Sequence, residues 1–427
     1  MKRMIRNRLA ILWLAALATS AAAAEPLVPG WAWRAPDDRP FPILAWWGPH
    51  AHQLTDAIWG DMAAAGFNLC MPPFGDDENN RKALALGRKY GIGIVAIGVE
   101  WEKADKPEKA EQFEANLKSK VSQWAHEPAF AAYRLKDEPG AISFPALAKT
   151  RDVLKELDPD HWAYNNLFPV YAPCNDEMNF LQSSNYTDYV DKYMEMCRPE
   201  VLSYDHYGIR KDNTVTSGYF ENLEIIRTAA MKHNVPFWAF VLSTPLRPAF
   251  PTPTEGHLRF QLYCNLAYGA RCLQYFTYGE AEKTDGLINH QGETQHTYEL
   301  AKRINREIQH IGPLLLKLQS TAVFHTAPLP DATTEFQGHG GLLKCAGEAV
   351  LGFFDGPNGK PYLMVVNRHP GKSADLALTF SDDVAGVGEA DRSRPGGTVR
   401  PLELTNGELK FTLPDGDAKL LELKRLR

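Results

Sequence analysis

Residues 130–140 read Phe-Ala-Ala-Tyr-Arg-Leu-Lys-Asp-Glu-Pro-Gly. The segment begins as an apolar strand and ends in two adjacent carboxylates, Asp137 and Glu138, which are followed by Pro139 and Gly140. Proline cannot continue a sheet ladder and glycine releases the backbone, so we expect the strand to end at the carboxylates. In a parallel barrel that strand end lies on the face where such barrels carry out their chemistry. The alternative is that one carboxylate caps the next helix or pairs with an arginine.

The same alternation of an apolar strand and an amphipathic helix recurs on both sides of this segment. Strands are predicted at 42–47, 67–71, 93–97, 131–135, 162–166, 201–206, 237–242 and 271–277. Helices are predicted at 54–65, 81–90, 109–125, 145–157, 186–196, 219–233, 255–267 and 298–318. These repeated units favour an α/β fold, a closed (β/α)8 TIM barrel. The rival is an open doubly wound sheet, which usually has a glycine-rich turn after its first strand, and Trp46-Trp47-Gly48-Pro49 is not one.

The helical periodicity disappears from residue 321. A hairpin is predicted over 350–366, and short alternating strands follow at 374–380, 397–404, 409–413 and 419–423. Gly, Pro, Asn and Asp separate them, which is typical of an antiparallel β-sandwich. We therefore expect a catalytic barrel over residues 25–320 and a small β-sandwich domain, with a structural or substrate-supporting role, over 321–427.

Residues 1–24 have the pattern of a secretory signal peptide. Basic residues precede an apolar run at 9–18, and Ala22-Ala23-Ala24 forms a cleavage site. We expect an exported protein, periplasmic or extracellular, without a membrane anchor after cleavage. A retained anchor is the alternative, but the apolar run is shorter than the ~20 residues that a spanning helix needs.

Charge and cysteine content restrict the possible partners. The formal net charge is −6, and cleavage would remove four basic residues and no acidic one. Such an acidic chain is a poor nucleic-acid binder, although a local basic patch for a sulfated or carboxylated glycan is not excluded. No Cys/His spacing resembles a zinc site, and we expect neither a metal nor another cofactor. Among the six cysteines, Cys174 and Cys197 are the pair expected to form a bridge if one forms. The oligomeric state is not predicted.

Polar and aromatic residues follow most of the predicted strands. In strand order they are Trp46 and Trp47; Glu100 and Trp101; Asp137 and Glu138; Asn165 and Asn166; Tyr204, Asp205, His206 and Tyr207; Ser243 and Thr244; and Tyr275, Thr277, Tyr278 and Glu280. The carboxyl ends of parallel barrel strands meet at one face, so these side chains are expected to share a site. Carboxylates there can protonate a leaving oxygen and stabilise charge at an anomeric carbon, while aromatic rings stack on sugars. The pattern therefore predicts hydrolysis of a glycosidic bond in a carbohydrate.

The motif Tyr-Arg-Leu-Lys-Asp-Glu-Pro at 133–139 resembles the strand-four signature of clan A glycoside hydrolases, in which Asn-Glu-Pro or Asp-Glu-Pro carries the acid/base glutamate. Segments 266–278, 286–292 and 322–326, the last with its trailing sandwich, resemble bacterial barrel glycosidases of that broad type. The resemblance implies that Glu138 is the acid/base and that Asp137 stands where the family's Asn often contacts a sugar hydroxyl. It also implies a nucleophilic glutamate after strand seven, and Phe-Trp-Ala-Phe-Val-Leu-Ser at 237–243 contains none.

The second carboxylate must therefore come from elsewhere. Asp205 is preferred because it lies between aromatic residues at a strand end, with His206 beside it to orient it or bind a hydroxyl. The alternatives are that Asp205 pairs with Arg210 or caps a loop and that His206 belongs to the core. Glu280 and then Glu100 are the next candidates for the second carboxylate.

Strand geometry restricts the remaining positions, because successive side chains point to opposite faces. At most one of Trp46 and Trp47 can face the pocket, and Asn166 is favoured over Asn165 because it is nearer the strand end. Tyr204 and Tyr207 are expected to divide between core and site. The predicted substrate-binding set is Asp137, Trp46, Trp47, Glu100, Asn166, His206, Tyr207, Tyr275 and Glu280.

These residues suggest a mechanism for glycosidic bond hydrolysis, and two other functions are alternatives to it. Partial desolvation should keep Glu138 protonated near neutral pH, while Asp205 stays ionised as nucleophile or as base for water; the distance between the carboxyls decides which. The first rival is a non-catalytic glycan-binding protein on a degenerate barrel, supported by the missing strand-seven glutamate. The second is a hydrolase of a non-sugar ester or amide, for which the chain has no Gly-x-Ser-x-Gly elbow.

Overall fold

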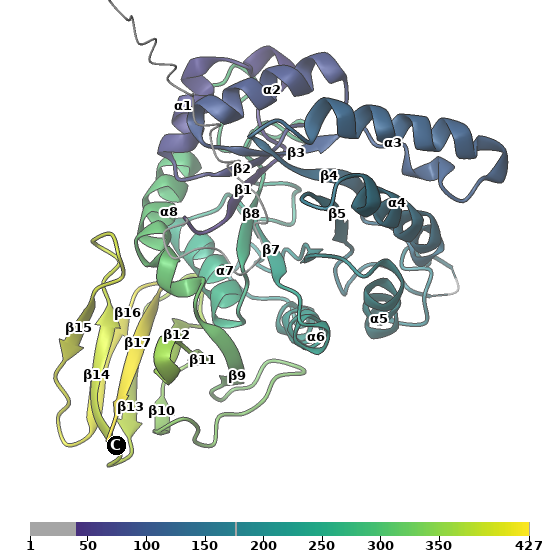
Figure 1. The fold of residues 1–427 in the computed structure, drawn as a ribbon. Coiled ribbons are helices and arrows are strands. Elements are labelled where there is room, and N and C mark those ends of the chain that lie inside the picture. Colours follow the sequence, from purple (N-terminus) through teal and green to yellow (C-terminus); the bar gives the residue numbers. More distant parts are fainter. Residues whose placement is uncertain (1–39, 176, 427) are drawn as a thin grey trace, which may run out of the picture.

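The computed structural model describes residues 40–175 and 177–426, and the predicted signal peptide lies outside them. In the described chain, parallel strands β1 to β8 close into a barrel in sequence order, with β1 paired to β8 (Figure 1). The strands are β1 (Ile43–Trp46), β2 (Leu69–Met71), β3 (Gly93–Ile97), β4 (Phe130–Asp137), β5 (Trp162–Leu167), β6 (Leu202–Tyr204), β7 (Phe237–Leu242) and β8 (Cys272–Phe276). The predicted (β/α)8 barrel is thus confirmed.

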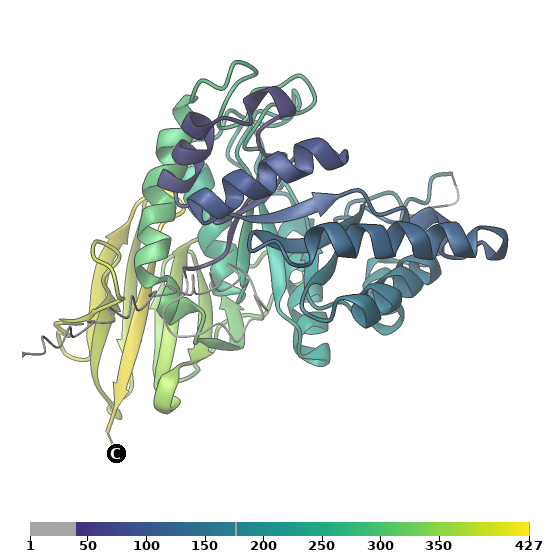
Figure 2. The same ribbon diagram turned by 45° about the horizontal axis from the view of Figure 1, so that its top comes forward.

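Helices cover the outside of the barrel (Figure 2). They are α1 (Asp56–Ala64), α2 (Asp77–Tyr90), α3 (Ala110–Trp124), α4 (Phe144–Leu157), α5 (Tyr186–Cys197), α6 (Gly218–His233), α7 (Glu255–Ala267) and α8 (His296–Leu315). Short 3₁₀ turns are η1 (Ala51–Gln53), η2 (Trp101–Lys103), η3 (Pro107–Lys109), η4 (Ala141–Ser143) and η5 (Pro357–Gly359). Local sequence sets the helix ends: at α2, the Asp76 side chain accepts a hydrogen bond from the Asn79 main-chain N–H, and Gly91 ends the helix at φ +71°.

Alternation along the strands divides the barrel residues into two cores. On β8, Leu273 and Tyr275 pack in the cluster shared with the helices, whereas Cys272 and Phe276 belong to the cluster inside the barrel. Gln274 also faces inward, since it hydrogen-bonds Ser203 across the barrel. This period of two determines which residues near the strand ends reach the mouth of the barrel.

The C-terminal region is built of two antiparallel sheets that enclose their own core. The six-stranded sheet has the order β15-β14-β17-β12-β11-β9, and the other has the order β10-β13-β16. The strands are β9 (Gln319–His325), β10 (Leu342–Ala346), β11 (Ala349–Asp355), β12 (Pro361–Asn367), β13 (Ala374–Phe380), β14 (Val384–Ala390), β15 (Val399–Leu402), β16 (Glu408–Leu413) and β17 (Ala418–Arg425). The expected β-sandwich is confirmed, although β9, β10 and β14 were not predicted as strands.

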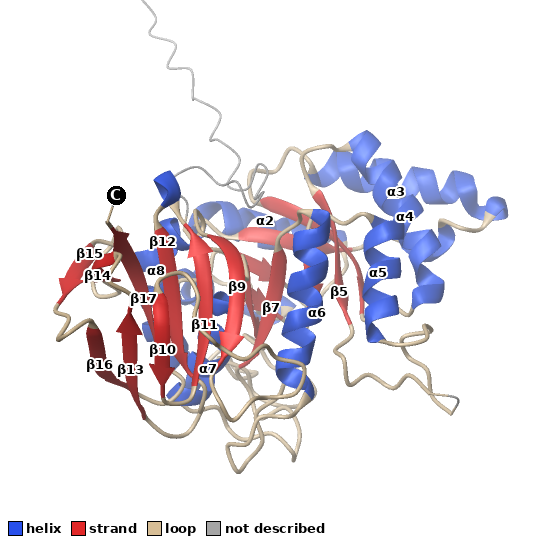
Figure 3. Ribbon diagram, turned by 90° about the horizontal axis from the view of Figure 1, so that it is seen from below, coloured by secondary structure: helices blue, strands red, loops and turns tan. Residues whose placement is uncertain are grey.

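The six-stranded sheet packs against α7 of the barrel (Figure 3). Buried Arg259 on α7 donates to Glu307 on α8 (Nη2 to Oε1, 2.7 Å) and to Asp417 beside β17 (Nη1 to Oδ1, 3.1 Å). Asp417 also accepts from Arg392 at 2.7 Å. Because these charges are paired and hydrogen-bonded, their burial is compensated, and they fix the sheet on the barrel.

The cysteines and helices bear on two further expectations. All six cysteines are free, so the bridge considered between Cys174 and Cys197 does not form. The thiol of Cys174 lies 3.1 Å from the carbonyl oxygen of Ser183, while Cys197 is buried on α5 against the carbonyl of Phe144. Among the described helices, none has the length and apolar character needed to cross a membrane.

Candidate active site

A cavity of about 560 Å³ opens at the carboxyl ends of the barrel strands. Carboxylates, two arginines and many aromatic rings line it. The lining residues are Trp46, Asp137, Glu138, Asn166, Phe168, Pro169, Tyr171, Ala172, Pro173, Phe180, Asp205, Tyr207, Arg210, Phe240, Leu246, Arg247, Ala249, Phe250, Phe276 and Glu282. Glu138 and Asp205, the two residues selected from the sequence, therefore face one cavity.

Asn166, near the end of β5, connects two carboxylates from the neighbouring strands. Its Nδ2 donates to Asp137 Oδ1 at 3.1 Å and to Asp205 Oδ1 at 2.9 Å. Its Oδ1 accepts from the hydroxyl of Ser203 at 3.0 Å. Because that oxygen is already occupied by a donor, the amide nitrogen must face the carboxylates.

A buried polar chain inside the barrel supports this arrangement. Tyr164 donates its hydroxyl to Gln274 Oε1 at 2.6 Å, and Gln274 Nε2 donates to Ser203 Oγ at 2.8 Å. Ser203 in turn holds Asn166. Each link pairs a buried polar group, so the chain ties the orientation of the site amide to three strands.

Glu138 has an unusual backbone and an electrostatic setting suited to proton transfer. Its φ is +47°, a left-handed conformation that non-glycine residues adopt at a cost of ~1–2 kcal/mol. The main-chain N–H donates to the Asn166 carbonyl at 2.8 Å, and no described residue donates a hydrogen bond to the half-buried carboxylate. Burial, then the charge of Asp137, raises the pKa of Glu138 to about 7; Glu282 adds to this and Arg247 opposes it.

Asp205 is buried, and its pKa is raised well above the ordinary range. Burial is the main cause, followed by the charges of Glu138 and Asp137, while the hydrogen bond from Asn166 acts in the opposite direction. The raised pKa disfavours the ionised form of Asp205, which is opposite to the expectation from the sequence. Because the charge of Glu138 is one cause of the raised pKa of Asp205, simultaneous ionisation of the two carboxyls is disfavoured. Among the described residues, no ion pair joins Asp205 to Arg210.

Asp137 shares the floor of the cavity but has a different setting. Burial raises its pKa, while Arg134, whose Nη2 lies 3.9 Å from Asp137 Oδ2, and the amide of Asn166 oppose the shift. Asp137 thus lines the same cavity as Glu138 and Asp205.

Aromatic rings form the walls of the cavity. Trp46 packs edge-on against Phe240, with ring centres 4.9 Å apart, and both face the interior. Trp47 stacks on Trp46 at 6.2 Å but does not line the cavity, so one of the two tryptophans faces the pocket and the other lies behind it. Tyr207 also lines the wall.

His206 was expected at the site and lies behind it. It is 3% exposed, and its Nδ1 lies 3.0 Å from Asn222 Oδ1 while its Nε2 lies 3.3 Å from Thr216 Oγ1. Burial lowers its pKa to about 4, so it is neutral at physiological pH. Alternation explains the outcome: Asp205 and Tyr207 point into the cavity, and His206 points to the helix layer.

Tyr275 and Glu280 were also expected to bind substrate and do not line the cavity. Tyr275 is fully buried among the helices and donates to Asn305 Oδ1 at 2.6 Å, so the next residue, Phe276, reaches the cavity instead. Glu280 pairs with His290 at 2.9 Å, and Glu282, two residues later, lines the cavity in its place.

Glu100 was also predicted to bind substrate and does not line the cavity. Tyr204 and Asn165 lie outside the cavity as well. Glu100 precedes η2 and forms an ion pair with Lys103 at 2.5 Å, away from the cavity lining. Tyr204 packs in the helix-facing core, and Asn165 donates to the hydroxyl of Tyr193 on α5. Asn166, not Asn165, is thus the site amide.

Several lining residues were not predicted because they come from loops. Tyr171 and Phe180 belong to the segment between β5 and α5; Arg210 follows β6; Arg247 and Phe250 follow β7. Loops have no hydrophobic period to read. The signal that was available is their length, since long loops at this barrel face are where binding residues concentrate.

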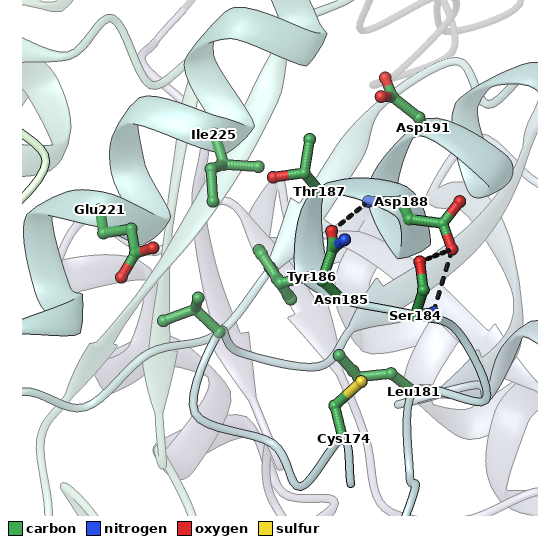
Figure 4. Close-up of a pocket in the computed structure, with 11 residues that line it drawn as sticks. Cys174, Leu181, Ser184, Asn185, Tyr186, Thr187, Asp188, Asp191, Glu221 and Ile225 are labelled. Atoms are coloured by element: carbon green, nitrogen blue, oxygen red, sulfur yellow. Dashed lines mark hydrogen bonds between the residues drawn. The ribbon is translucent and has the colours of Figure 1, made fainter.

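A second hollow, of about 860 Å³, lies between α5 and α6 (Figure 4). Several of its polar groups have local partners: Asn185 caps α5 by accepting from the Asp188 N–H at 2.9 Å, and Asp188 accepts from Ser184 and Lys192. The described residues contain no cluster of three or more metal-ligating side chains, here or elsewhere. The mouth of the barrel is therefore the candidate active site.

The fold is similar to that of solved glycoside hydrolase structures. No protein-family model matches the sequence, and no curated protein matches it either. Among solved structures, a glycoside hydrolase is similar with a TM-score of 0.56 at 12% identity, over 90% of this chain and 92% of that one. A glycoside hydrolase family 5 protein from Bacteroides vulgatus gives 0.55 at 10% identity, over 90% and 88%. The match to a β-galactosidase from Marinomonas ef1 spans 65% of this chain and only 62% of that longer one, at 11% identity and a TM-score of 0.48. The barrel thus has the (β/α)8 fold found in glycoside hydrolases, and in this chain antiparallel sheets follow it.

Proposed function

We propose that this protein is a glycoside hydrolase that cleaves an oligo- or polysaccharide with Glu138 as general acid/base and Asp205 as the second carboxylate. The observation that carries the proposal is that both side chains line one aromatic-walled cavity at the barrel mouth. The fold shared with glycoside hydrolases supports it.

The division of roles follows from the surroundings of each carboxyl. Glu138 receives no hydrogen bond from the described residues, and its pKa of about 7 lets it carry a proton near neutral pH. Asp205 accepts from Asn166, which favours its ionised form. Positive charge that develops at the anomeric carbon stabilises ionised Asp205 and offsets its raised pKa, and the proton for the leaving oxygen is assigned to Glu138.

The proposal includes export of the protein and assigns no cofactor. The signal-like pattern of residues 1–24 supports export to the periplasm or the outside of the cell, where polysaccharides are encountered. The chemistry needs two carboxyls and water, so no cofactor is assigned.

The test begins with a panel of plant, algal and bacterial polysaccharides, with reducing ends as the readout. On a substrate that is cleaved, Glu138→Gln should lower kcat/KM by about 10²–10⁴-fold. On nitrophenyl glycosides the loss should be much smaller, because that leaving group departs without protonation. Asp205→Asn should impair both substrates equally. Glu100→Gln, a carboxylate outside the cavity, is the matched control and should keep full activity.

Full activity of Glu138→Gln on the polysaccharide would overturn the assignment. Binding of a glycan without release of reducing ends would favour the other candidate, a glycan-binding protein on a degenerate barrel. That candidate is supported by the end of β7, where Ser243 and Thr244 are buried and donate to main-chain carbonyls of Thr277 and Asp285.

A further inference from the structure

Two arginines reach the cavity from the loops after β6 and β7. Both Arg210 and Arg247 are exposed, and neither guanidinium donates a hydrogen bond to any described residue. The Cζ atom of Arg210 lies 5.4 Å from the ring centre of Phe250. Arg247 Nη2 lies 3.7 Å from Glu282 Oε1, which is too long for a hydrogen bond. Their donors are therefore unused.

Two less exposed arginines of the barrel, Arg259 and Arg271, do have structural partners. Arg259 holds Glu255, Glu307 and Asp417, and Arg271 donates to main-chain carbonyls near the end of α8. Each guanidinium offers five N–H donors in a planar fork that matches a carboxylate or a sulfate. Arg210 and Arg247 have this capacity at a cavity: among the described residues Arg210 has no acidic partner, and Arg247 has only the 3.7 Å pair with Glu282.

The Arg210 side chain is supported in place by its loop. A bridge between Ile209 and Val215 closes the loop, and the Arg210 N–H donates to the Thr214 carbonyl at 2.9 Å. The ring of Phe250 covers one face of the guanidinium, so its edges are the part left for a ligand. Less side-chain freedom is then lost when an anion binds.

An anionic sugar could bind in this cavity only with positive charges such as those of Arg210 and Arg247. The other ionisable side chains of the lining are Asp137, Glu138, Asp205, Glu282 and the tyrosines, and the whole chain carries a net charge of −6. An anionic sugar would be repelled from such a cavity without a local positive counterpart. Arg210 and Arg247 supply two positive charges from the loops after β6 and β7, and the charge of Arg247 opposes the rise in the pKa of Glu138.

We propose that the bound glycan carries an anionic substituent, a carboxylate or a sulfate, that Arg210 and Arg247 bind beside Glu138. This inference rests on the proposed function, whose substrate class it names. Two cations in one cavity of an acidic protein fit a single charged sugar in a defined subsite. They do not fit non-specific attraction of a polyanion along the surface.

The test is calorimetric binding to the Glu138→Gln protein, in which turnover is suppressed. The probes are D-glucuronate, D-galacturonate and glucose 6-sulfate, each compared with its neutral sugar. Charged probes should bind about 10–100-fold more tightly, as expected for charge-assisted hydrogen bonds, and high salt should reduce the preference. The uronates and the sulfate ester distinguish the two sources of the anion.

Second-site variants locate the anion. Arg210→Met should lower the charged-to-neutral affinity ratio by about tenfold or more, and Arg247→Met should lower it less, because Glu282 partly neutralises that side chain. Arg306→Met removes the same charge from an exposed position of α8 outside the cavity lining and should leave the ratio unchanged. Thermal melting checks that each variant is folded.

Two outcomes separate this inference from the proposed function. Equal affinity for charged and neutral sugars, or an unchanged ratio in a folded Arg210→Met protein, would overturn the inference even if neutral glycans are hydrolysed. Selective binding of charged sugars through Arg210, with no reducing ends released by the wild-type protein from uronate or sulfated polysaccharides, would support the inference and count against the proposed function.

Discussion

The two sides of the cavity are built differently. On the β4–β6 side, Glu138, Asn166 and Asp205 lie at or next to the strand ends, and the amide is held by a buried polar chain. On the β7–β8 side, the strands end in apolar residues, and the charged groups Arg247 and Glu282 come from exposed loops with a loose 3.7 Å pair. We propose from this difference that the strand-end side performs the proton transfer of the proposed function, while the loop side holds the substrate and adjusts charge.

The largest expected effect compares the carboxylates of the two sides. Asp205→Asn should lower kcat/KM by about 10²–10⁴-fold, because the strand-end carboxylate acts on the reacting centre. Glu282→Gln should cost less than about tenfold, because Glu282 acts only through its charge. Steady-state kinetics on one cleaved glycan measures both. The reverse order would make Glu282 the second carboxylate.

The next effect compares two neighbouring amides of β5. Asn166→Ala removes the donor to Asp137 and Asp205 and should lower kcat by about 10²-fold. Asn165→Ala removes a hydrogen bond to Tyr193 on the opposite face, so it should cost about 1 kcal/mol of stability and little activity. Similar kinetic losses in both folded variants would mean that the buried chain does not position the carboxylates.

A smaller effect concerns the pH dependence of kcat/KM. Substitutions on the two sides of the cavity should shift its basic limb in opposite directions. If protonated Glu138 is the acid, kcat/KM falls as the pH rises through its pKa of about 7. Asp137→Asn removes a repelling charge, lowers the pKa of Glu138 and moves this limb to lower pH. Arg247→Met removes an attracting charge, raises that pKa and moves the limb to higher pH. Shifts in the same direction would contradict the electrostatic assignment.

The smallest effect is on stability. The pKa of Glu138 rises from 4.5 to about 7 on folding, so its contribution to stability is present below pH 4.5 and is lost as the pH rises through 7. Glu138→Gln removes this cost and should stabilise the protein by about 1–3 kcal/mol at pH 8, with little change at pH 4.5. Denaturant unfolding at the two pH values measures this, and destabilisation at pH 8 would show that the carboxylate has a structural partner.

The barrel and part of the site were predictable from the sequence, because a period of two places residues reliably up to the strand ends. The same period could have excluded two candidates: His206 alternates with Asp205, and Tyr275 follows inward-facing Gln274. The position of Glu282 could not be predicted in this way. It lies in a turn after β8, where its φ is +49° and the alternation of the strand no longer applies. Arg210 and Arg247 are likewise placed by loop contacts that no periodic pattern encodes.

The central claim is that Glu138 can donate a proton near neutral pH because burial in the cavity and the charge of Asp137 raise its pKa. The most direct test is a ¹³C NMR titration of the protein labelled at glutamate, with Glu138→Gln used to assign the signal, and it needs no substrate. We predict that Glu138 titrates near pH 7 in the wild-type protein and at lower pH in Asp137→Asn. An ordinary value near 4.5 in both proteins would contradict the account.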